Sequence, residues 1–286
     1  MSDPQPQRTP RSLIVTFYGA YGRDAKGAPL GPVPVAALIT LLGVAGVDPP
    51  SVRSAVSRLK RRGLLVPART SSGAAGYALS ADARELLADG DRRIYGRPTP
   101  RASDGWVLAV FSVPEEERHK RHLLRSRLAR LGFGTAAPGV WIAPGHLYEE
   151  TRHVLRRLQL DPYVDLFTGA HAGFAPTAEA VTRWWDLPAI AARHRAFLDA
   201  HEPVLGRWSR RRSTDLEAAY HDYLMTLDAW RRLPYADPGL PAALLPADWP
   251  GGHAAAVFGR LHRRLHAAGA EYVSGVLGER GAAGAE

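Results

Sequence analysis

The chain has 286 residues, of which 45% are hydrophobic and 23% charged, the usual balance of a folded globular protein. Its length suits two or three domains of roughly 100–150 residues each. The absence of cysteine excludes disulfide frameworks, thiolate metal sites and cysteine nucleophiles. No apolar run reaches the roughly 18 residues of a membrane span, and the polar N-terminus predicts no signal peptide, so we expect a cytoplasmic protein.

Positive charge is concentrated in the first third of the chain. The formal net charge is +9, and residues 1–97 hold 14 Lys and Arg against 7 Asp and Glu. Over the remaining residues the two kinds nearly balance, at 23 against 21. This asymmetry predicts an anion-binding function in the N-terminal third. The preference for arginine over lysine has an alternative explanation in a GC-rich genome, so it proves nothing on its own.

The first 62 residues predict three helices. Thr9 and Pro10 form a helix start, and apolar residues then recur with helical spacing up to Tyr21. A turn-rich segment over 22–34 leads to a second helix over about 35–42. Asp48, followed by two prolines, starts a third helix over about 49–62.

The third predicted helix has an apolar face and a basic face. Val52, Ala55, Val56 and Leu59 share one side, while serines and basic residues occupy the other. After Gly63, strands near 64–66 and 77–79 enclose a tip of Gly, Ser and Ala, and Ser80 starts a further short helix. Three helices followed by a hairpin predict a winged helix-turn-helix.

Such a fold places its third helix in the major groove of DNA, where arginine bonds guanine edges and serine hydroxyls reach bases or phosphates. The alternative is a solvated basic face on an ordinary helix. We expect the first half of the helix to meet base edges, and its basic end and the hairpin to meet phosphates. The predicted DNA-binding residues are Ser51, Arg53, Ser54, Ser57, Arg58, Lys60, Arg61, Arg62, Arg69, Ser71 and Ser72.

The middle of the chain alternates strands and helices after a proline-rich linker at 96–100. This alternation predicts a ferredoxin-like α/β sandwich, and long helical patterns follow from Pro176, interrupted over 233–252. The predicted strands are 106–113, 140–143 and 164–167, and the predicted helices are 115–131 and 148–158. The expected fold is therefore α+β and multidomain, with a winged helix domain over 1–97, a middle domain over 98–175 and a mainly helical, effector-binding domain over 176–286.

No motif for catalysis, a cofactor or a metal is present. The chain has no Gly-x-Ser-x-Gly elbow, no P-loop and no dinucleotide-binding glycine pattern. His262 and His266 share a helical face with His253 nearby, but zinc needs further ligands, so surface or core histidines are the better interpretation. The first strand of the middle domain resembles that of CRISPR spacer-acquisition nucleases, yet it ends Phe111-Ser112-Val113-Pro114 without the aspartate that would hold their metal.

The segment from Trp230 to Gly251 combines prolines, aromatics and arginines. Prolines stiffen a loop, and aromatics beside arginines suit an anionic, partly apolar ligand. The alternative is a loop that packs on the helical domain through its tryptophans. The candidate effector-binding residues are Arg231, Arg232, Tyr235 and Trp249.

These features resemble the PaaX family, transcriptional repressors of phenylacetic acid degradation in bacteria. The resemblance rests on Arg11–Ile14, Ser51–Leu59, Trp106, Leu131–Gly134, Trp141–Pro144 and the segment 230–251, and it covers nearly the whole chain. It implies a homodimeric repressor that binds double-stranded operator DNA. Because one winged helix covers one half-site, a dimer predicts an inverted repeat, and we expect no cofactor. It also implies release by a small-molecule effector, an acyl-CoA such as phenylacetyl-CoA.

Two other classes of function stay open from the sequence. One is an enzyme that acts on nucleic acid or an acyl-CoA, with the basic third of the chain as a docking module. Such an enzyme would need a convergent acid–base pair near a pocket, which the sequence does not locate. The other is a DNA-binding protein that responds to no ligand.

Overall fold

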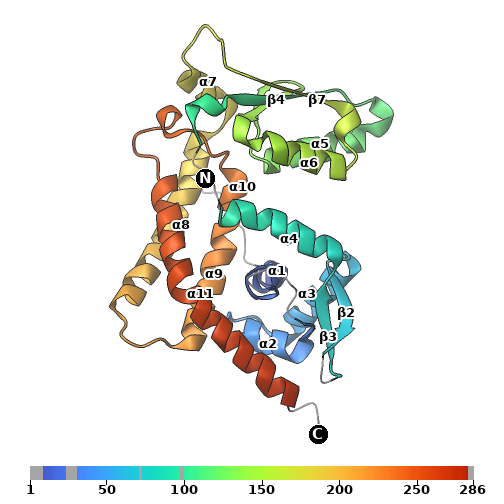
Figure 1. Ribbon diagram of the computed structural model, residues 1–286, viewed down its shortest axis with the longest axis vertical. Helices are drawn as coiled ribbons and strands as arrows, with labels where there is room; N and C mark the ends of the chain where they lie inside the picture. The colour runs from blue at the N-terminus through green and yellow to red at the C-terminus, as the bar shows by residue number, and fades with distance from the viewer. Residues whose placement is uncertain (1–8, 24–30, 71–72, 97–99, 283–286) are drawn as a thin grey trace. The chain divides into compact units, whose positions relative to one another are not determined.

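The structure is a computed structural model that describes residues 9–23, 31–70, 73–96 and 100–282. The described chain is a mixed α and β protein with two small antiparallel sheets (Figure 1). It forms two compact units. Unit 1 comprises Met1–Gly96, Phe197–Arg231 and Ala255–Glu286, and unit 2 comprises Arg97–Ala196 and Arg232–Ala254. The predicted division into three domains stays a prediction.

The N-terminal part of unit 1 has the helices that the sequence predicts. Thr9 caps the first helix by accepting a hydrogen bond from the amide of Ser12, and Ser80 caps the fourth through the amide of Ala83. The buried faces of the first three helices pack together. The helices are α1 (Pro10–Tyr21), α2 (Val35–Gly43), α3 (Pro49–Arg61) and α4 (Ala81–Ile94).

The sheet of unit 1 has one strand more than the sequence predicts. Strands β2 (Leu65–Arg69) and β3 (Ala75–Leu79) form the predicted hairpin, and β1 (Val33–Pro34) adds to the other edge of β3. Gly76 makes this possible, because a Cβ there would come within 2.7 Å of the Val33 carbonyl oxygen. A strand of two residues has no periodicity to detect, so the sequence predicted only a turn-rich segment.

Helices from the C-terminal half complete unit 1. Helix α9 (Leu216–Trp230) contacts α1, and its Asp228 is fully buried. The Asp228 carboxylate accepts hydrogen bonds from the hydroxyls of Ser12, at 2.5 Å, and Thr16, at 2.8 Å. It also pairs with Arg231 at 3.3 Å. A buried carboxylate with these partners fastens α9 to the helix on which α3 packs.

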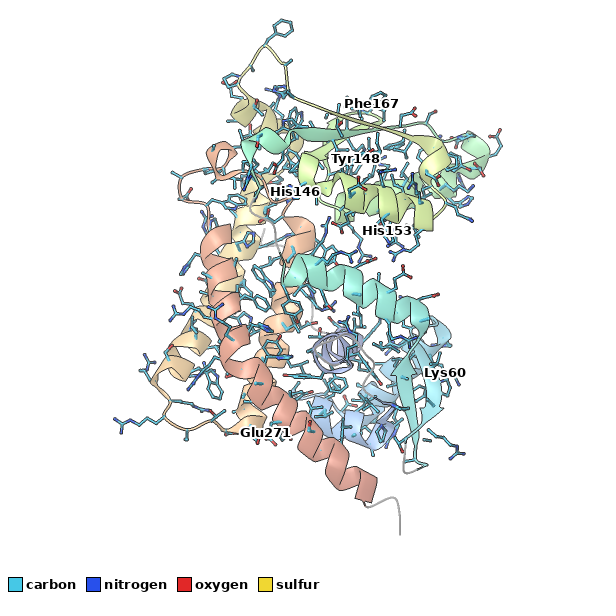
Figure 2. All side chains as sticks on the ribbon, viewed as in Figure 1. Lys60, His146, Tyr148, His153, Phe167 and Glu271 are labelled. Carbon is cyan, nitrogen blue, oxygen red and sulfur yellow. The ribbon has the colours of Figure 1, made fainter. Side chains whose placement is uncertain are left out.

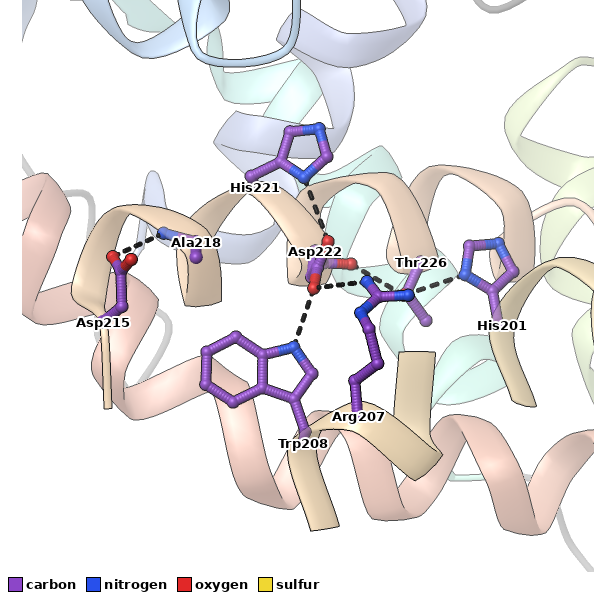
Figure 3. Close-up of polar contacts among 8 residues, drawn as sticks. All are labelled: His201, Arg207, Trp208, Asp215, Ala218, His221, Asp222 and Thr226. Carbon is purple, nitrogen blue, oxygen red and sulfur yellow. Dashed lines mark hydrogen bonds and ion pairs between the residues drawn. The ribbon is translucent and has the colours of Figure 1, made fainter. Parts of the chain in front are cut away.

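A second carboxylate on α9 links it to α8 (Leu187–Arg210) within unit 1 (Figure 3). Asp222 accepts a hydrogen bond from the Trp208 indole at 2.7 Å and pairs with Arg207 at 3.2 Å. Burial acts to raise the pKa of Asp222, but hydrogen bonds from His221 and Trp208 and the charge of Arg207 outweigh it and lower the pKa. The last helix, α11 (Gly251–Ala282), also contributes most of its length to unit 1.

Unit 2 is built on a sheet with strand order β5-β6-β4-β7. Strand β5 was not predicted, because its Gly, Thr and Ala residues show no apolar alternation. The strands are β4 (Trp106–Phe111), β5 (Gly134–Ala137), β6 (Val140–Pro144) and β7 (Val164–Gly169), and the helices between them are α5 (Arg118–Arg130) and α6 (Tyr148–Arg157). The predicted linker lies mostly on residues 97–99, outside the described residues.

The two faces of this sheet carry separate cores. On one face, Val107 and Ala109 pack with Leu124, Leu128 and Leu155 of α5 and α6, which lie against the sheet in Figure 1. On the other face, Trp106 and Ile142 pack with apolar residues that include Val181 of α7 (Thr177–Trp184) and Leu240. The proline-rich segment predicted over 233–252 therefore contributes to a core, and within it lies the short helix α10 (Leu233–Ala236).

Candidate nucleic-acid interface

Helix α3 is fixed at its start and along one face. The Asp48 carboxylate accepts a hydrogen bond from the Ser51 amide at 2.9 Å, and two prolines fill the first turn, where no intrahelical donors are needed. Hydrogen bonding from Ser51 holds the pKa of Asp48 below its ordinary value. Gly63, at φ +69°, takes the left-handed conformation that ends the helix. The predicted inward residues of α3, Val52, Ala55, Val56 and Leu59, are all at most 3% exposed.

The opposite face of α3 is an exposed basic surface. Lys60, a residue of this helix, is labelled in Figure 2. Within the part of the chain that the structure describes, none of these cations makes an ion pair or a side-chain hydrogen bond, so their charge is not neutralised. The members of this surface, which we call the α3 basic face, are Arg53, Ser54, Ser57, Arg58, Lys60, Arg61 and Arg62, and each is exposed. Ser51 is half-buried at the helix start.

The β2–β3 hairpin contributes one further cation. Arg69 is exposed and donates a hydrogen bond to the Gly73 carbonyl oxygen at 2.8 Å, which holds its side chain against the turn. The predicted contacts Ser71 and Ser72 lie outside the described residues. A hairpin that presents an arginine beside a basic helix has the charge that a phosphate backbone requires.

The four predicted effector residues do not all lie in one unit. Arg231 belongs to unit 1, where it pairs with Asp228 and donates to the Ser12 hydroxyl at 2.8 Å. Arg232, Tyr235 and Trp249 belong to unit 2 and are half-buried. The guanidinium carbon of Arg130 lies 5.9 Å from the centre of the Tyr235 ring, a cation–π distance.

The proline-rich segment is anchored by a buried histidine. His194 of α8 is fully buried, and its Nε2 lies 2.8 Å from the Asp237 carboxylate. The Trp249 ring packs edge-on against the same imidazole, with ring centres 6.0 Å apart. Trp249 thus packs the segment against His194 of α8. A loop that packs through its tryptophans is the alternative that the sequence left open.

His262 and His266 lie in unit 1 among aromatic rings. The Nδ1 of His262 is 2.7 Å from the Tyr223 hydroxyl, and His266 stacks on Tyr21 with ring centres 5.5 Å apart. Burial, with the nearby His266 and Arg263, lowers the pKa of His262 to about 4. No group of three or more His, Asp or Glu side chains among the described residues is placed to hold a metal ion.

Two features of the site region were missed from the sequence. Asp228, which holds α1, gave no signal, because a lone aspartate in a predicted helix is normally solvated. Arg121 and Arg125 line a cleft of about 520 Å³ in unit 2. Their spacing of four residues after a strand could have indicated a shared helical face, but nothing in the sequence marks the opposite wall.

Comparison with known proteins gives a consistent result along the chain. Residues 9–83 match a family model described as PaaX-like protein, residues 99–181 the PaaX protein central Cas2-like domain, and residues 185–275 the PaaX-like protein C-terminal domain. The transcriptional repressor PaaX of Escherichia coli strain K12 is 27% identical over 271 residues, which cover 92% of this chain and 82% of the relative.

A solved structure has a related fold. The uncharacterized protein Rv0674 from Mycobacterium tuberculosis superposes with a TM-score of 0.53 at 24% identity, over 96% of this chain and 98% of that one. No helix in the described part of our chain is long and apolar enough to cross a membrane. With three family models matched in order along its sequence, the chain belongs to the PaaX family.

Proposed function

We propose that the protein is a transcriptional repressor that binds double-stranded operator DNA through the α3 basic face. The observation that carries this proposal is a run of exposed cations on one helix face without partners in the described chain. The name of the Escherichia coli relative supports repression rather than an enzymatic activity, and a repressor would act in the cytoplasm, beside the chromosome.

In this proposal α1 to α3 and the β2–β3 hairpin form a winged helix-turn-helix. Arg53, Ser54, Ser57 and Arg58 lie in the first half of α3, the part that meets base edges when such a helix enters the major groove. Lys60, Arg61 and Arg62 lie near its end and contact phosphates, with Arg69 on the wing. Ser51 and, at the hairpin tip, Ser71 and Ser72 stay predicted contacts.

The strand order of unit 2 supports a ferredoxin-like fold for the middle of the chain. Its four antiparallel strands alternate with α5 and α6, and both helices contribute to the core on one face. We propose that this part, with the C-terminal helices, makes a homodimer. Two winged helices then occupy an inverted repeat whose half-sites lie about one helical turn of DNA apart, or a multiple of it.

We further propose that a small organic anion, such as an aromatic acyl-CoA, binds the C-terminal two-thirds and lowers the affinity for operator. Release requires that the ligand prefer the conformer with misplaced recognition helices, since equal affinity shifts no equilibrium. Arg232, Tyr235 and Trp249 are the predicted contacts. Arg231 stays in the proposal, although its present partners are Asp228 and Ser12. Calorimetry with phenylacetyl-CoA, with and without operator, tests the coupling; equal binding to both forms contradicts it.

The DNA proposal is tested by removing two arginines from each of two helices. A DNA site is first selected from a random pool with the intact protein. The Arg53→Ala/Arg58→Ala variant should lose about 2–6 kcal/mol of binding free energy, because each base-reading arginine contributes about 1–3 kcal/mol. An Arg118→Ala/Arg125→Ala variant loses the same charge from α5 and should bind within about 0.5 kcal/mol of the wild type. Normal binding by the α3 variant in a gel-shift titration contradicts the proposed interface.

A further inference from the structure

Unit 2 contains a cleft between α5 and the β5–β6 hairpin. Its volume is about 520 Å³, and Phe111 and Ser112, at and just after the end of β4, complete its wall. Small-molecule sites in proteins commonly measure about 300–1,000 Å³. The cleft contains none of the predicted DNA contacts and none of Arg231, Arg232, Tyr235 and Trp249. It is therefore separate from every site that the sequence predicts.

One wall of the cleft is aromatic and rigid. Trp141 lies on β6 with its side chain 8% exposed, and it belongs to the core beneath α5 and α6. Phe111 packs against the same core from β4. The Trp141 indole N–H makes no hydrogen bond to any residue that the structure describes. The wall thus offers flat apolar surface together with an unused donor.

The other wall carries positive charge. Arg121 donates to the Val113 carbonyl oxygen at 2.7 Å and pairs with Glu115 at 3.1 Å, which fixes its guanidinium. Arg125 lies four residues further along the same face of α5, is exposed and has no ion pair or hydrogen bond within the described chain. No carboxylate is among the described residues that line the cleft. One positive charge therefore remains uncompensated beside an aromatic wall.

We propose that this cleft binds an organic anion in which a flat aromatic group lies next to a carboxylate or phosphate. The acid group pairs with Arg125, and the ring lies against Phe111 and Trp141. A guanidinium recognises both kinds of acid through paired N–H donors. The binding site stands on the geometry of unit 2 alone. Its use as the effector site rests on the proposed repressor function, and the two are tested separately.

Calorimetry on the full chain without DNA tests the site. The probes are 1-naphthyl phosphate and 1-naphthylacetate, and the controls are inorganic phosphate, which lacks the ring, and 1-naphthol, which lacks the acid. We expect at least one naphthyl acid to bind at least tenfold more tightly than either control. Comparing the two acids distinguishes phosphate from carboxylate as the preferred group. A wild type that binds neither acid overturns the proposal.

Two variants and a matched control locate the binding. Arg125→Gln should raise the Kd of the naphthyl acid at least fivefold. Arg118→Gln removes the same exposed charge from α5 outside the cleft and should change that Kd less than twofold. Thr135→Trp fills the cleft from β5 without changing the charge and should abolish binding, with an unchanged urea-unfolding midpoint as the folding control. Equal binding by Arg125→Gln and the wild type overturns the proposal, as does equal weakening by Arg118→Gln.

Operator affinity with and without the naphthyl acid is the separate readout for regulation. An acid that binds wild type but not Arg125→Gln establishes the site, whether or not operator affinity changes. A fall in operator affinity in the wild type alone also makes it the effector site. Failure of operator binding without any ligand would count against the repressor function and leave the calorimetric result in place.

Discussion

Helices α3 and α5 have the same length and are both rich in arginine, but their cations differ in whether they have acidic partners. Each has 13 residues. The cations of α3 have no acidic partners among the described residues. On α5, Lys120 pairs with Glu117 at 2.7 Å and Arg121 with Glu115 at 3.1 Å. The acids that precede α5 neutralise part of its charge, whereas the one acid before α3, Asp48, caps the helix. Nearby carboxylates therefore decide which cations of a basic helix stay unpaired, and arginine content alone does not.

The largest effect on stability is expected from the loss of the buried Asp228 carboxylate in unit 1. Asp228→Ala should lower the free energy of unfolding by about 3–5 kcal/mol, because it leaves Arg231 and two hydroxyls without their buried partner. Asp215→Ala is the matched control on α9. Asp215 caps that helix through the Ala218 amide at 3.0 Å, and its loss should cost about 1 kcal/mol. Urea unfolding measures both; a smaller loss for Asp228→Ala than for Asp215→Ala contradicts the role of this carboxylate.

The sequence predicted what depends on local pattern. The Asp48 cap, the prolines and the inward positions of α3 follow from spacing and capping chemistry, and the structure confirms each. The same holds for the helices and strands of the middle region, apart from β5. The sequence also predicts one contiguous N-terminal domain over 1–97. Unit 1 combines the first 96 residues with two later stretches of the chain, and the predicted domain division stays a prediction.

What the sequence could not predict depends on partners distant in the chain. Asp228 contacts Ser12 across more than two hundred residues, and β1 exists because Gly76 admits the Val33 carbonyl. The cleft beside Arg125 needs a hairpin that starts with the unpredicted β5. These features arise from tertiary packing, which leaves no periodic trace in the residues that contribute to it.

A smaller effect should distinguish a half-buried histidine of unit 1, His262, from an exposed one of unit 2, His122. The pKa of His262 is lowered to about 4 by burial and by His266 and Arg263. A histidine in the unfolded chain titrates near 6.5, so the unfolded state takes up this proton first and stability falls as the pH drops from about 6.5 towards 4.

Between pH 7 and 4.5, His262→Gln should therefore lose about 1–2 kcal/mol less stability than the wild type. The ring keeps some contact with water, which holds the difference below the full linkage value. His122→Gln, at an exposed position on α5, is the control and should follow the wild type. Urea unfolding at the two pH values measures the difference. Parallel pH profiles for wild type and His262→Gln would mean that His262 titrates normally in the folded protein.

The smallest effect is the most direct comparison of the two basic helices. Arg62 is the C-cap that follows α3, and Arg118 begins α5; both are exposed, and neither has an ion pair within the described chain. If Arg62 contacts a phosphate, Arg62→Ala should make the slope of log K against log salt shallower by about 0.9 and weaken operator and unrelated DNA alike. Arg118→Ala removes the same charge and should leave the slope unchanged, because a contact that releases no counterion has no salt dependence to lose. Filter binding between 50 and 200 mM salt resolves a change of this size, because a protein that makes several phosphate contacts loses about 10³–10⁵ in affinity over that range. Equal slopes for the two variants would mean that DNA responds to the net charge of the protein and not to the placement of the α3 basic face.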